Sequence, residues 1–254
     1  MILWLVATPA AAELRVCADP NNLPFSNQAR EGFENRIVEH IAADWGETVH
    51  YVWWAQRRGN VRNTLNARLC DVIPGVASTL EMLATTRPYY RTSYMVVTRA
   101  DRKIEIEGFD DPLLRSLSLG VQMIGDDGAN TPPAMALAKR GLTNNVHGYM
   151  VYGDYGEAAP QSAIVDAVSR GEVDLAYVWG PVAGYFGARA STALSIRPVT
   201  PWLDGPTLPM AFDVSMGVRK DDYALRRRLD NWLTAHQAEI TNILTAYGVP
   251  LPSP

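Results

Sequence analysis

The stretch Leu14–Gly46, LRVCADPNNLPFSNQAREGFENRIVEHIAADWG, decides the expected fold. A short apolar strand leads into a turn rich in proline and asparagine, and a helix with apolar residues every four positions follows. This order predicts the opening βα unit of an α/β sheet, in which ligands lie beyond the carboxyl ends of the strands. We therefore expect Asn21, Asn22 and Phe25 to stand at the mouth of a cleft, although an ordinary strand, turn and helix would show the same pattern.

The composition is that of a soluble globular protein, since 47% of the 254 residues are hydrophobic and 20% are charged. A formal net charge of −4, with dispersed basic residues, argues against a nucleic-acid partner, because phosphate binding needs concentrated lysine and arginine. The sequence holds no G-x-S-x-G, H-E-x-x-H or phosphate-loop motif, and no haem-attachment motif. We therefore predict a protein that is not an enzyme and carries no cofactor or metal.

The first twelve residues have features of a secretory signal sequence. Ile2–Val6 is an apolar run, and Ala10 and Ala12 form an A-x-A cleavage pattern before Glu13. We interpret residues 1–12 as the remnant of a secretory signal, so the mature chain is expected to be exported. No later apolar run is long enough to span a bilayer, and we expect no membrane span in the mature chain.

Strands and helices alternate along the chain in two successive sets, and a return segment rich in proline and glycine follows. We predict an α/β protein of two lobes, joined by two crossings, with a ligand cleft between the lobes and hinge closure around it. The first lobe comprises residues 13–98 and 212–254, and the second lobe comprises residues 99–211.

The two cysteines belong to strands that we expect to be neighbours. Cys17 lies in the first strand, and Cys70 opens the strand CDVIPGV after a helix that Asn60 is expected to cap. In the strand order 2-1-3 the two strands are adjacent, and an exported protein would preserve a disulfide between them. We predict a disulfide between Cys17 and Cys70; the alternative is a pair of buried free thiols.

Several short motifs resemble those of the periplasmic solute-binding proteins that carry polar amino acids. The family pattern combines an aspartate and a P-F turn, a G-F-x-x-x-I helix, a D-V-I-x-G strand and a P-Y-Y segment. This chain carries Asp19, Pro24-Phe25, Gly32-Phe33, Ile37, Asp71-Val72-Ile73, Gly75 and Pro88-Tyr89-Tyr90. The resemblance runs from about Leu14 to Val249 and implies the two-lobed periplasmic-binding-protein fold of type II.

Longer motifs point to one subfamily of these proteins. The segments VCADPNNLPFS, GFENRI, WWAQRRGNVRNTL, TTRPYYR, GVQMIGDDGANTPPA and GYMVYGDY occur in this order. Together they are similar to the solute-binding-like proteins associated with quinoprotein (PQQ-dependent) methanol or alcohol dehydrogenases. That resemblance implies a periplasmic accessory protein that works beside the dehydrogenase and its c-type cytochrome.

Two charged clamps of the amino-acid carriers are missing. The carriers hold the ligand's carboxylate with an arginine ahead of the P-Y-Y segment, where this chain has ASTLEM at residues 77–82. They hold the ammonium group with an aspartate two residues before a proline of the second lobe, where this chain has Trp179 before Pro181. A free amino acid is therefore not the expected ligand, because its two charges would lack partners.

Aromatic and basic residues stand where the clamps are missing. They follow the predicted second strand, precede the lobe crossing or come from the second lobe. Flat rings with arginine suit a planar or anionic ligand, or the anchor of a protein partner. Core packing is an equal alternative for Trp53, and solvated surface charge is the alternative for Arg57 and Arg58. This group of candidate cleft residues comprises Trp53, Trp54, Gln56, Arg57, Arg58, Tyr89, Tyr90, Arg91, Trp179 and Tyr185.

The turn Ile124–Pro132 ends a strand and opens a helix, and it adds Asp126, Asp127, Asn130 and Thr131 to the candidate site. Such a turn offers backbone N–H groups to an anion, but two aspartates oppose that use. Helix capping, a solvated loop and a cation held by oxygen ligands are the alternatives.

Our leading hypothesis is a periplasmic accessory protein that docks to a PQQ-dependent dehydrogenase or aids its maturation. The second hypothesis is the solute receptor of an ABC importer for a small aromatic or anionic ligand. The third is an enzyme of the dehydratase kind, because this fold has been recruited for such chemistry. Weak candidates for its acid or base are Glu34, Asp154 and Asp213.

Overall fold

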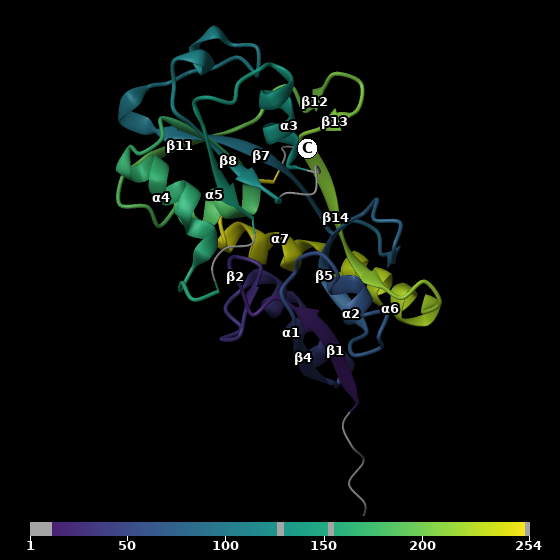
Figure 1. The fold of residues 1–254 in the computed structure, drawn as a ribbon. Helices are drawn as coiled ribbons and strands as arrows, with labels where there is room; N and C mark the ends of the chain where they lie inside the picture. The colour runs from purple at the N-terminus through teal and green to yellow at the C-terminus, as the bar shows by residue number, and fades with distance from the viewer. Residues whose placement is uncertain (1–11, 126–129, 152–154, 252–254) are drawn as a thin grey trace, which may run out of the picture.

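The computed structural model describes residues 12–125, 130–151 and 155–251, and it shows an α/β chain of two lobes (Figure 1). The lower lobe in this view contains β1, β4 and β5, and the upper lobe contains β8, β11 and α4. The predicted two-lobed fold is confirmed. Residues 1–11 of the predicted secretory signal lie outside the described residues.

The first lobe is built on the predicted 2-1-3 strand order. The strand β1 (Glu13–Ala18) lies between two parallel neighbours, β4 (Thr48–Trp53) and β5 (Val72–Ala77). The helix α1 (Phe33–Trp45) buries its apolar face against this sheet, and Gly46 ends it in the left-handed conformation that glycine adopts without steric cost. This arrangement places the turn after β1 at the carboxyl edge of the sheet, as the opening sequence predicts.

One element of the first lobe is shorter than expected. The helix that begins at Asn60, α2 (Asn60–Asn63), has a single turn, because the backbone of Thr64 leaves the helical region. The hydroxyl of Thr64 donates a hydrogen bond to the carbonyl of Asn60, and the chain then turns toward Cys70. The remaining short strands of this lobe are β2 (Asn21–Asn22), β3 (Ser26–Asn27) and β6 (Ala84–Thr85).

The second lobe repeats the alternation of strand and helix. Its parallel strands are β8 (Leu119–Met123), β9 (Val146–Met150) and β10 (Leu175–Trp179). Its helices are α3 (Pro132–Lys139), α4 (Ala163–Arg170) and α5 (Gly180–Gly187). The sequence did not predict β11 (Leu194–Pro198), which pairs with the edge of β7. Short elements complete the lobe: η1 (Ala100–Arg102), η2 (Pro112–Arg115), η3 (Pro160–Ser162), β12 (Leu203–Asp204) and β13 (Leu208–Pro209).

Two long strands connect the lobes. Within β7 (Tyr90–Arg99) and β14 (Ala211–Val218), the segment Tyr90–Ser93 pairs antiparallel with Ala211–Val214. The rest of β7, from Tyr94 onward, pairs with strands of the second lobe. We therefore propose that the second lobe begins near Tyr94, a few residues before the boundary inferred from the sequence.

The C-terminal helices return to the first lobe and then touch the second. The helices are α6 (Tyr223–Ala235) and α7 (Gln237–Ala246), and α7 runs across the waist of the molecule in Figure 1. Beyond α7, the carbonyl of Pro250 accepts a 2.7 Å hydrogen bond from the hydroxyl of Thr92 in β7. A Cβ on Gly184 in α5 would lie 1.8 Å from the carbonyl oxygen of Gly248, so this close backbone contact requires glycine. The C-terminal segment is thus a third connection between the lobes.

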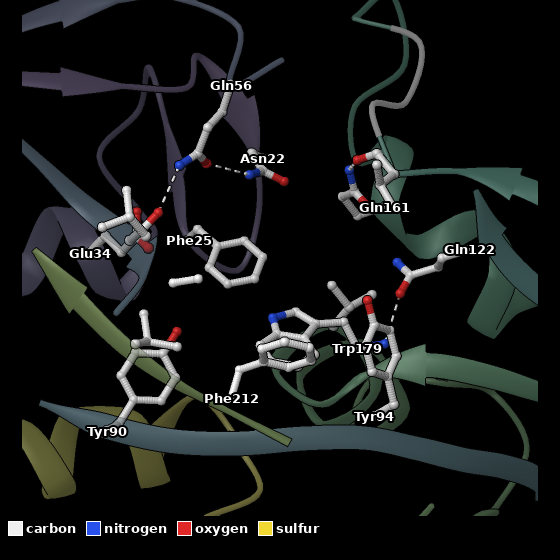
Figure 2. Close-up of a pocket in the computed structure, with 16 residues that line it drawn as sticks. Asn22, Phe25, Glu34, Gln56, Tyr90, Tyr94, Gln122, Gln161, Trp179 and Phe212 are labelled. Atoms are coloured by element: carbon white, nitrogen blue, oxygen red, sulfur yellow. Dashed lines mark hydrogen bonds between the residues drawn. The ribbon is translucent and has the colours of Figure 1, made fainter. Parts of the chain in front are cut away.

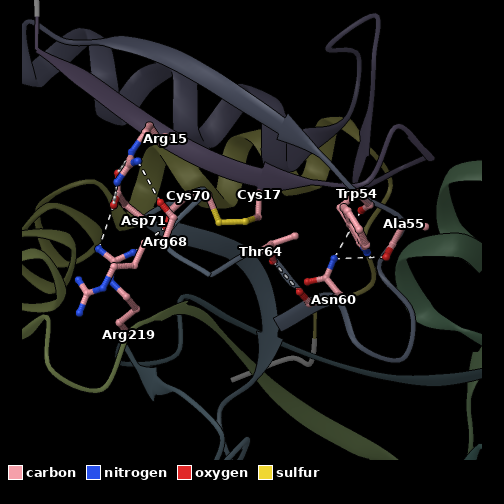
Figure 3. Close-up of a disulfide and its surroundings, with 10 residues drawn as sticks. All are labelled: Arg15, Cys17, Trp54, Ala55, Asn60, Thr64, Arg68, Cys70, Asp71 and Arg219. Atoms are coloured by element: carbon pink, nitrogen blue, oxygen red, sulfur yellow. Dashed lines mark hydrogen bonds and ion pairs between the residues drawn. A yellow bond between two sulfur atoms is a disulfide. The ribbon is translucent and has the colours of Figure 1, made fainter. Parts of the chain in front are cut away.

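The predicted disulfide joins Cys17 at the end of β1 to Cys70 just before β5, with 5.5 Å between the Cα atoms (Figure 3). Both cysteines are buried in a small apolar cluster of the first lobe. Beside them, the guanidinium of Arg15 makes two hydrogen bonds of 2.7 and 2.8 Å to Asp71, which also accepts one from Arg219 at 2.9 Å. Covalent and ionic links therefore hold β1 against β5 on the same side of the lobe.

We expect replacement of both cysteines, Cys17→Ala with Cys70→Ala, to lower the free energy of unfolding by about 2 to 4 kcal/mol, because the bond closes a loop in the unfolded chain. Denaturant titration of the oxidised wild type and the double variant measures this difference. Adding a reductant should bring the wild type to the stability of the double variant and leave the variant unchanged. Equal stability of all four samples would contradict the prediction.

Candidate functional site

A cavity of about 340 Å³ lies between the lobes (Figure 2). The first lobe contributes the turn after β1, the start of α1 and the end of β5, and the second lobe contributes β8, β10 and the start of α5. The crossing strands β7 and β14 provide the wall between these two sets. Its described lining residues are Asn22, Phe25, Glu34, Gln56, Gly75, Val76, Ala77, Tyr90, Tyr94, Gln122, Val151, Gln161, Trp179, Val182, Phe212 and Val214.

The buried carboxylate of Asp19 organises the first-lobe rim of the cavity. It accepts backbone hydrogen bonds from Asn21 at 2.9 Å and from Gln56 at 2.7 Å. Its other contact comes from the second lobe, where the hydroxyl of Tyr155 donates at 2.6 Å. One carboxylate therefore fixes the turn that carries Asn22, positions Gln56 and holds the two lobes together.

Three mutually packed aromatic rings form the second-lobe end of the cavity. The centroid of the Trp179 ring lies 5.1 Å from that of Tyr94 and 5.9 Å from that of Phe212. The backbone N–H of Trp179 donates a 2.7 Å hydrogen bond to the side-chain oxygen of Gln122, which ties β10 to β8 at this point. Because the rings come from β10, β7 and β14, this cluster depends on the lobe crossing.

The first-lobe end contains the buried carboxyl group of Glu34, at the start of α1. Its residue is 4% exposed, and burial, with a smaller effect from the charge of Asp19, raises its pKa to about 8. A Cβ on Gly75 would lie 2.0 Å from a carboxyl oxygen of Glu34, so the absence of a side chain at Gly75 makes room for this group. Within the described part of the chain, no hydrogen bond or ion pair engages the carboxyl of Glu34.

Five of the predicted cleft residues line the cavity: Asn22, Phe25, Gln56, Tyr90 and Trp179. Glu34, named from the sequence only as a weak candidate for an acid or base, lines it as well. Phe25 and Tyr90 both pack on Phe33 of α1, with centroid distances of 5.3 and 6.0 Å. These residues follow the rule that drove the prediction, because they lie at the carboxyl ends of strands or at the lobe crossing.

Two further candidates lie where the lobes meet outside the cavity. The side chain of Asn21 donates a 2.7 Å hydrogen bond to the carbonyl of Glu157. The guanidinium of Arg57 lies over the ring of Tyr155, 5.3 Å from its centroid. Asn21 and Arg57 therefore hold the lobes together at the rim of the cavity.

Four candidates lie away from the cavity wall. Tyr89 is buried in the core of the first lobe, where its hydroxyl donates to the carbonyl of Pro74. The ring of Trp53 stacks on Tyr51, which is the core-packing alternative. The side chain of Arg91 pairs with Asp213 at 2.9 Å, and the ring of Tyr185 stacks on Tyr247 at a centroid distance of 5.8 Å. The rings of Tyr89 and Tyr90 pack edge to face, with their centroids 4.9 Å apart, and of the two only Tyr90 is among the described lining residues of the cavity.

The turn before α3 stabilises itself. The side-chain oxygen of Asn130 accepts hydrogen bonds from the backbone of Ile124 and of Thr131, and the hydroxyl of Thr131 donates to the carbonyl of Gln122. Asn130 and Thr131 do not line the cavity. Asp126, Asp127 and Asp154 lie outside the described residues.

Sequence reasoning missed several residues of the cavity wall: Tyr94, Gln122, Val151, Gln161, Val182, Phe212 and Val214. Gln122 stands near the carboxyl end of a predicted strand, so the rule that selected Trp179 also applies to it. Phe212 carries no such signal, because its place in the wall depends on how β14 crosses between the lobes.

A second hollow, of about 800 Å³, adjoins the cavity on the outer side of Gln56, Gly75 and Val76. We call it the arginine groove, because Arg57, Arg58 and Arg62 line it and no acidic residue occurs among its described lining residues. The remaining described lining residues are Gly59, Asn60, Val61, Ile73, Leu80 and Met82. Trp54, which is 40% exposed, lies beside Asn60 (Figure 3), whose side chain donates to the carbonyl of Trp54 at 3.5 Å. Exposed apolar side chains therefore accompany the positive charge.

The described residues form neither a metal centre nor a membrane-spanning helix. In residues 12–125, 130–151 and 155–251, no cluster of three histidine, cysteine, aspartate or glutamate side chains is arranged to hold a metal ion. Over the same ranges, no helix has the length and apolar character needed to cross a membrane.

The pattern of the bacterial extracellular solute-binding proteins, family 3, matches residues 14–249. The chain belongs to this family. It is 33% identical to Protein MoxJ of Methylorubrum extorquens, in an alignment that covers 96% of this chain and 83% of MoxJ. The resemblance inferred from the sequence motifs is thereby confirmed.

Two crystal structures superpose on this chain over most of its length. The periplasmic binding protein XoxJ from Methylobacterium extorquens AM1 is 31% identical, with a TM-score of 0.76 and coverage of 95% of this chain and 100% of XoxJ. MxaJ from Methlophaga aminisulfidivorans MPT is 25% identical, with a TM-score of 0.77 and coverage of 94% of this chain and 100% of MxaJ. The solute-binding scaffold is therefore shared along nearly the whole chain.

The raised pKa of Glu34 predicts a specific pH dependence of stability. The folded-state pKa of Glu34, about 8, lies above the ordinary value of 4.5, so the folded chain binds this proton more tightly than the unfolded chain. The contribution of Glu34 to the free energy of unfolding is therefore fully present below pH 4.5 and is lost as pH rises toward 8. Between these values, the free energy of unfolding of the wild type should fall relative to that of Glu34→Gln by about 1.4 kcal/mol per pH unit. Denaturant titrations at several pH values measure the difference.

The matched control is Glu39→Gln, on the outer side of the same helix, where the carboxylate accepts a hydrogen bond from Tyr51. A trend of the same size in Glu39→Gln, or no trend in Glu34→Gln, would contradict the assignment to Glu34.

Proposed function

We propose that this family member is an exported accessory protein of a PQQ-dependent methanol or alcohol dehydrogenase, and that it acts by docking to the enzyme or aiding its maturation rather than by catalysis. The observation that carries the proposal is a solute-binding scaffold whose inter-lobe cavity presents no cation among its described lining residues. Such a cavity has nothing to pair with the carboxylate of an amino acid. Similarity to MoxJ over 96% of the chain supports the dehydrogenase as partner.

The proposed docking surface is the arginine groove. Its three arginines and the exposed Met82, with the exposed Trp54 beside the lining residue Asn60, combine positive charge with apolar area. Arginine and aromatic residues dominate contact energy at protein interfaces. The complementary partner surface is an acidic segment with one or two apolar side chains. Export fits this role, since the family consists of extracellular proteins and XoxJ is described as a periplasmic binding protein.

A receptor for an importer is the second candidate, and the inter-lobe cavity of about 340 Å³ favours it. The cavity fits a small solute with an aromatic or otherwise apolar body, in agreement with its ring cluster. It does not favour an anionic solute, because the one charged side chain among the described lining residues is Glu34.

Docking is tested by measuring the affinity of the purified dehydrogenase for the immobilised full chain. We expect Arg58→Gln with Arg62→Gln to weaken binding at least about tenfold, since each lost charge contact at an interface removes on the order of 1 kcal/mol or more. Wild-type binding should also weaken as salt rises. The c-type cytochrome of the same system is offered separately as a second analyte.

The matched control replaces two exposed cations of the second lobe, Lys103→Gln with Arg115→Gln, and should bind like the wild type. Failure of the wild type to bind the dehydrogenase in either its apo or its PQQ-loaded form would contradict the docking proposal. If the groove variant and the control lost the same affinity for the dehydrogenase, net charge rather than the groove would explain the loss. That result would overturn the assignment of the groove as the docking surface.

A further inference from the structure

The inter-lobe cavity contains a carboxyl group that its own surroundings do not pair. Glu34 is 4% exposed, lines the cavity and is the one charged side chain among the described lining residues. No described residue donates a hydrogen bond to its carboxyl oxygens or forms an ion pair with them. An unpaired buried carboxyl costs free energy, so its place in the wall of a ligand-sized cavity calls for a bound partner.

The backbone of β5 is shaped to admit this group. Gly75 lies where any side chain would collide with the carboxyl of Glu34, since a Cβ there would lie 2.0 Å from its oxygen. The amide of Gln56 donates to the carbonyl of Gly75 at 2.9 Å, which fixes this strand end beside the cavity. The carboxyl of Glu34 therefore fits at the wall because Gly75 has no side chain, and no hydrogen bond from the described residues holds it there.

Aromatic rings surround the space beyond the carboxyl. Phe25 and Tyr90 lie on the Glu34 side of the cavity in Figure 2, and Trp179, Phe212 and Tyr94 lie beyond them, toward the second lobe. The faces of such rings attract cations, and they also provide apolar area for the body of a ligand.

We propose that the cavity binds a small organic cation, with its ammonium group at the carboxylate of Glu34 and its apolar body against the ring cluster of Trp179, Tyr94 and Phe212. A single carboxylate suits a monovalent ammonium, whereas a divalent metal ion would need several oxygen ligands at once. The ligand class differs from that of an amino acid, because nothing among the described lining residues pairs with a second, negative group. The argument for this ligand does not rest on a dehydrogenase docking at the arginine groove.

The test is isothermal titration of the full chain at pH 8 with three probes of one shape: benzylammonium, benzyl alcohol and benzoate. We expect benzylammonium to bind at least about tenfold more tightly than either other probe, because it alone supplies a positive charge to Glu34. Benzyl alcohol binding as tightly as benzylammonium, preference for benzoate, or no heat from benzylammonium at millimolar concentration would overturn the proposal.

Two variants and a control locate the site. Glu34→Gln removes the charge at constant shape, and Gly75→Ala displaces the carboxyl. Each variant should weaken benzylammonium binding about tenfold or more. In Glu34→Gln, the weak binding of benzyl alcohol should stay nearly unchanged. Glu39→Gln, on the same helix, should bind all three probes like the wild type. Thermal melts confirm that each variant is folded. Wild-type affinity for benzylammonium in a folded Glu34→Gln would refute the role of Glu34.

Release of a proton on ligand binding distinguishes direct pairing with Glu34 from a purely structural role of this residue. The groups that face its carboxyl are Asp19, Tyr89 and Tyr90, and burial keeps the pKa of Glu34 near 8, so most molecules carry the proton at pH 7. Binding of benzylammonium should therefore release nearly one proton at pH 7 and little at pH 9, measured from the binding heat in buffers of different ionisation enthalpy. Binding without proton release at pH 7 would contradict pairing with the carboxylate.

Discussion

Strands β7 and β14 pair across Tyr90–Ser93 and Ala211–Val214, at the point where the chain passes between the lobes. This short antiparallel ladder holds the two sheets in one orientation, and it also supplies Tyr90, Tyr94, Phe212 and Val214 to the cavity wall. The cavity and the junction of the lobes are therefore made by the same residues. Because the hydroxyl of Thr92 also bonds the C-terminal segment, any movement of the lobes must be absorbed by all three connections.

The charged side chains around the cavity are separated by sign. A carboxyl group lies inside, while the arginines lie outside in the groove, and Gln56, Gly75 and Val76 form the wall that the two hollows share. Burial makes the inner charge costly unless something pairs with it, whereas the arginines are close to water and pay little. In the proposed roles, the inner site would select a cation and the outer surface an acidic partner, so the two would not compete for one ligand.

The sequence predicted those parts of the fold that local patterns determine. The helix α1, its glycine end, the 2-1-3 strand order and the disulfide follow from apolar spacing and from the rules of parallel sheets. The site was harder to predict, because Tyr89 and Tyr90 are neighbours that both pack in the core of the first lobe, and only Tyr90 also lines the cavity. The roles of Glu34 and Gly75 arise from contact between α1 and β5, which lie far apart in the sequence. The unexpected strand β11 exists because β7 offers it an edge, again a tertiary cause.

Arg57 links the two hollows, since it lines the arginine groove and also lies over the ring of Tyr155 from the other lobe. Tyr155 in turn bonds Asp19, whose carboxylate fixes both Asn21 and Gln56. A protein that draws Arg57 into the groove removes one of the contacts that close the cavity, so occupancy of the groove and closure of the lobes draw on the same side chain. Thermodynamic linkage makes this relation reciprocal: whatever closes the lobes around the cavity changes the affinity of the groove by the same factor.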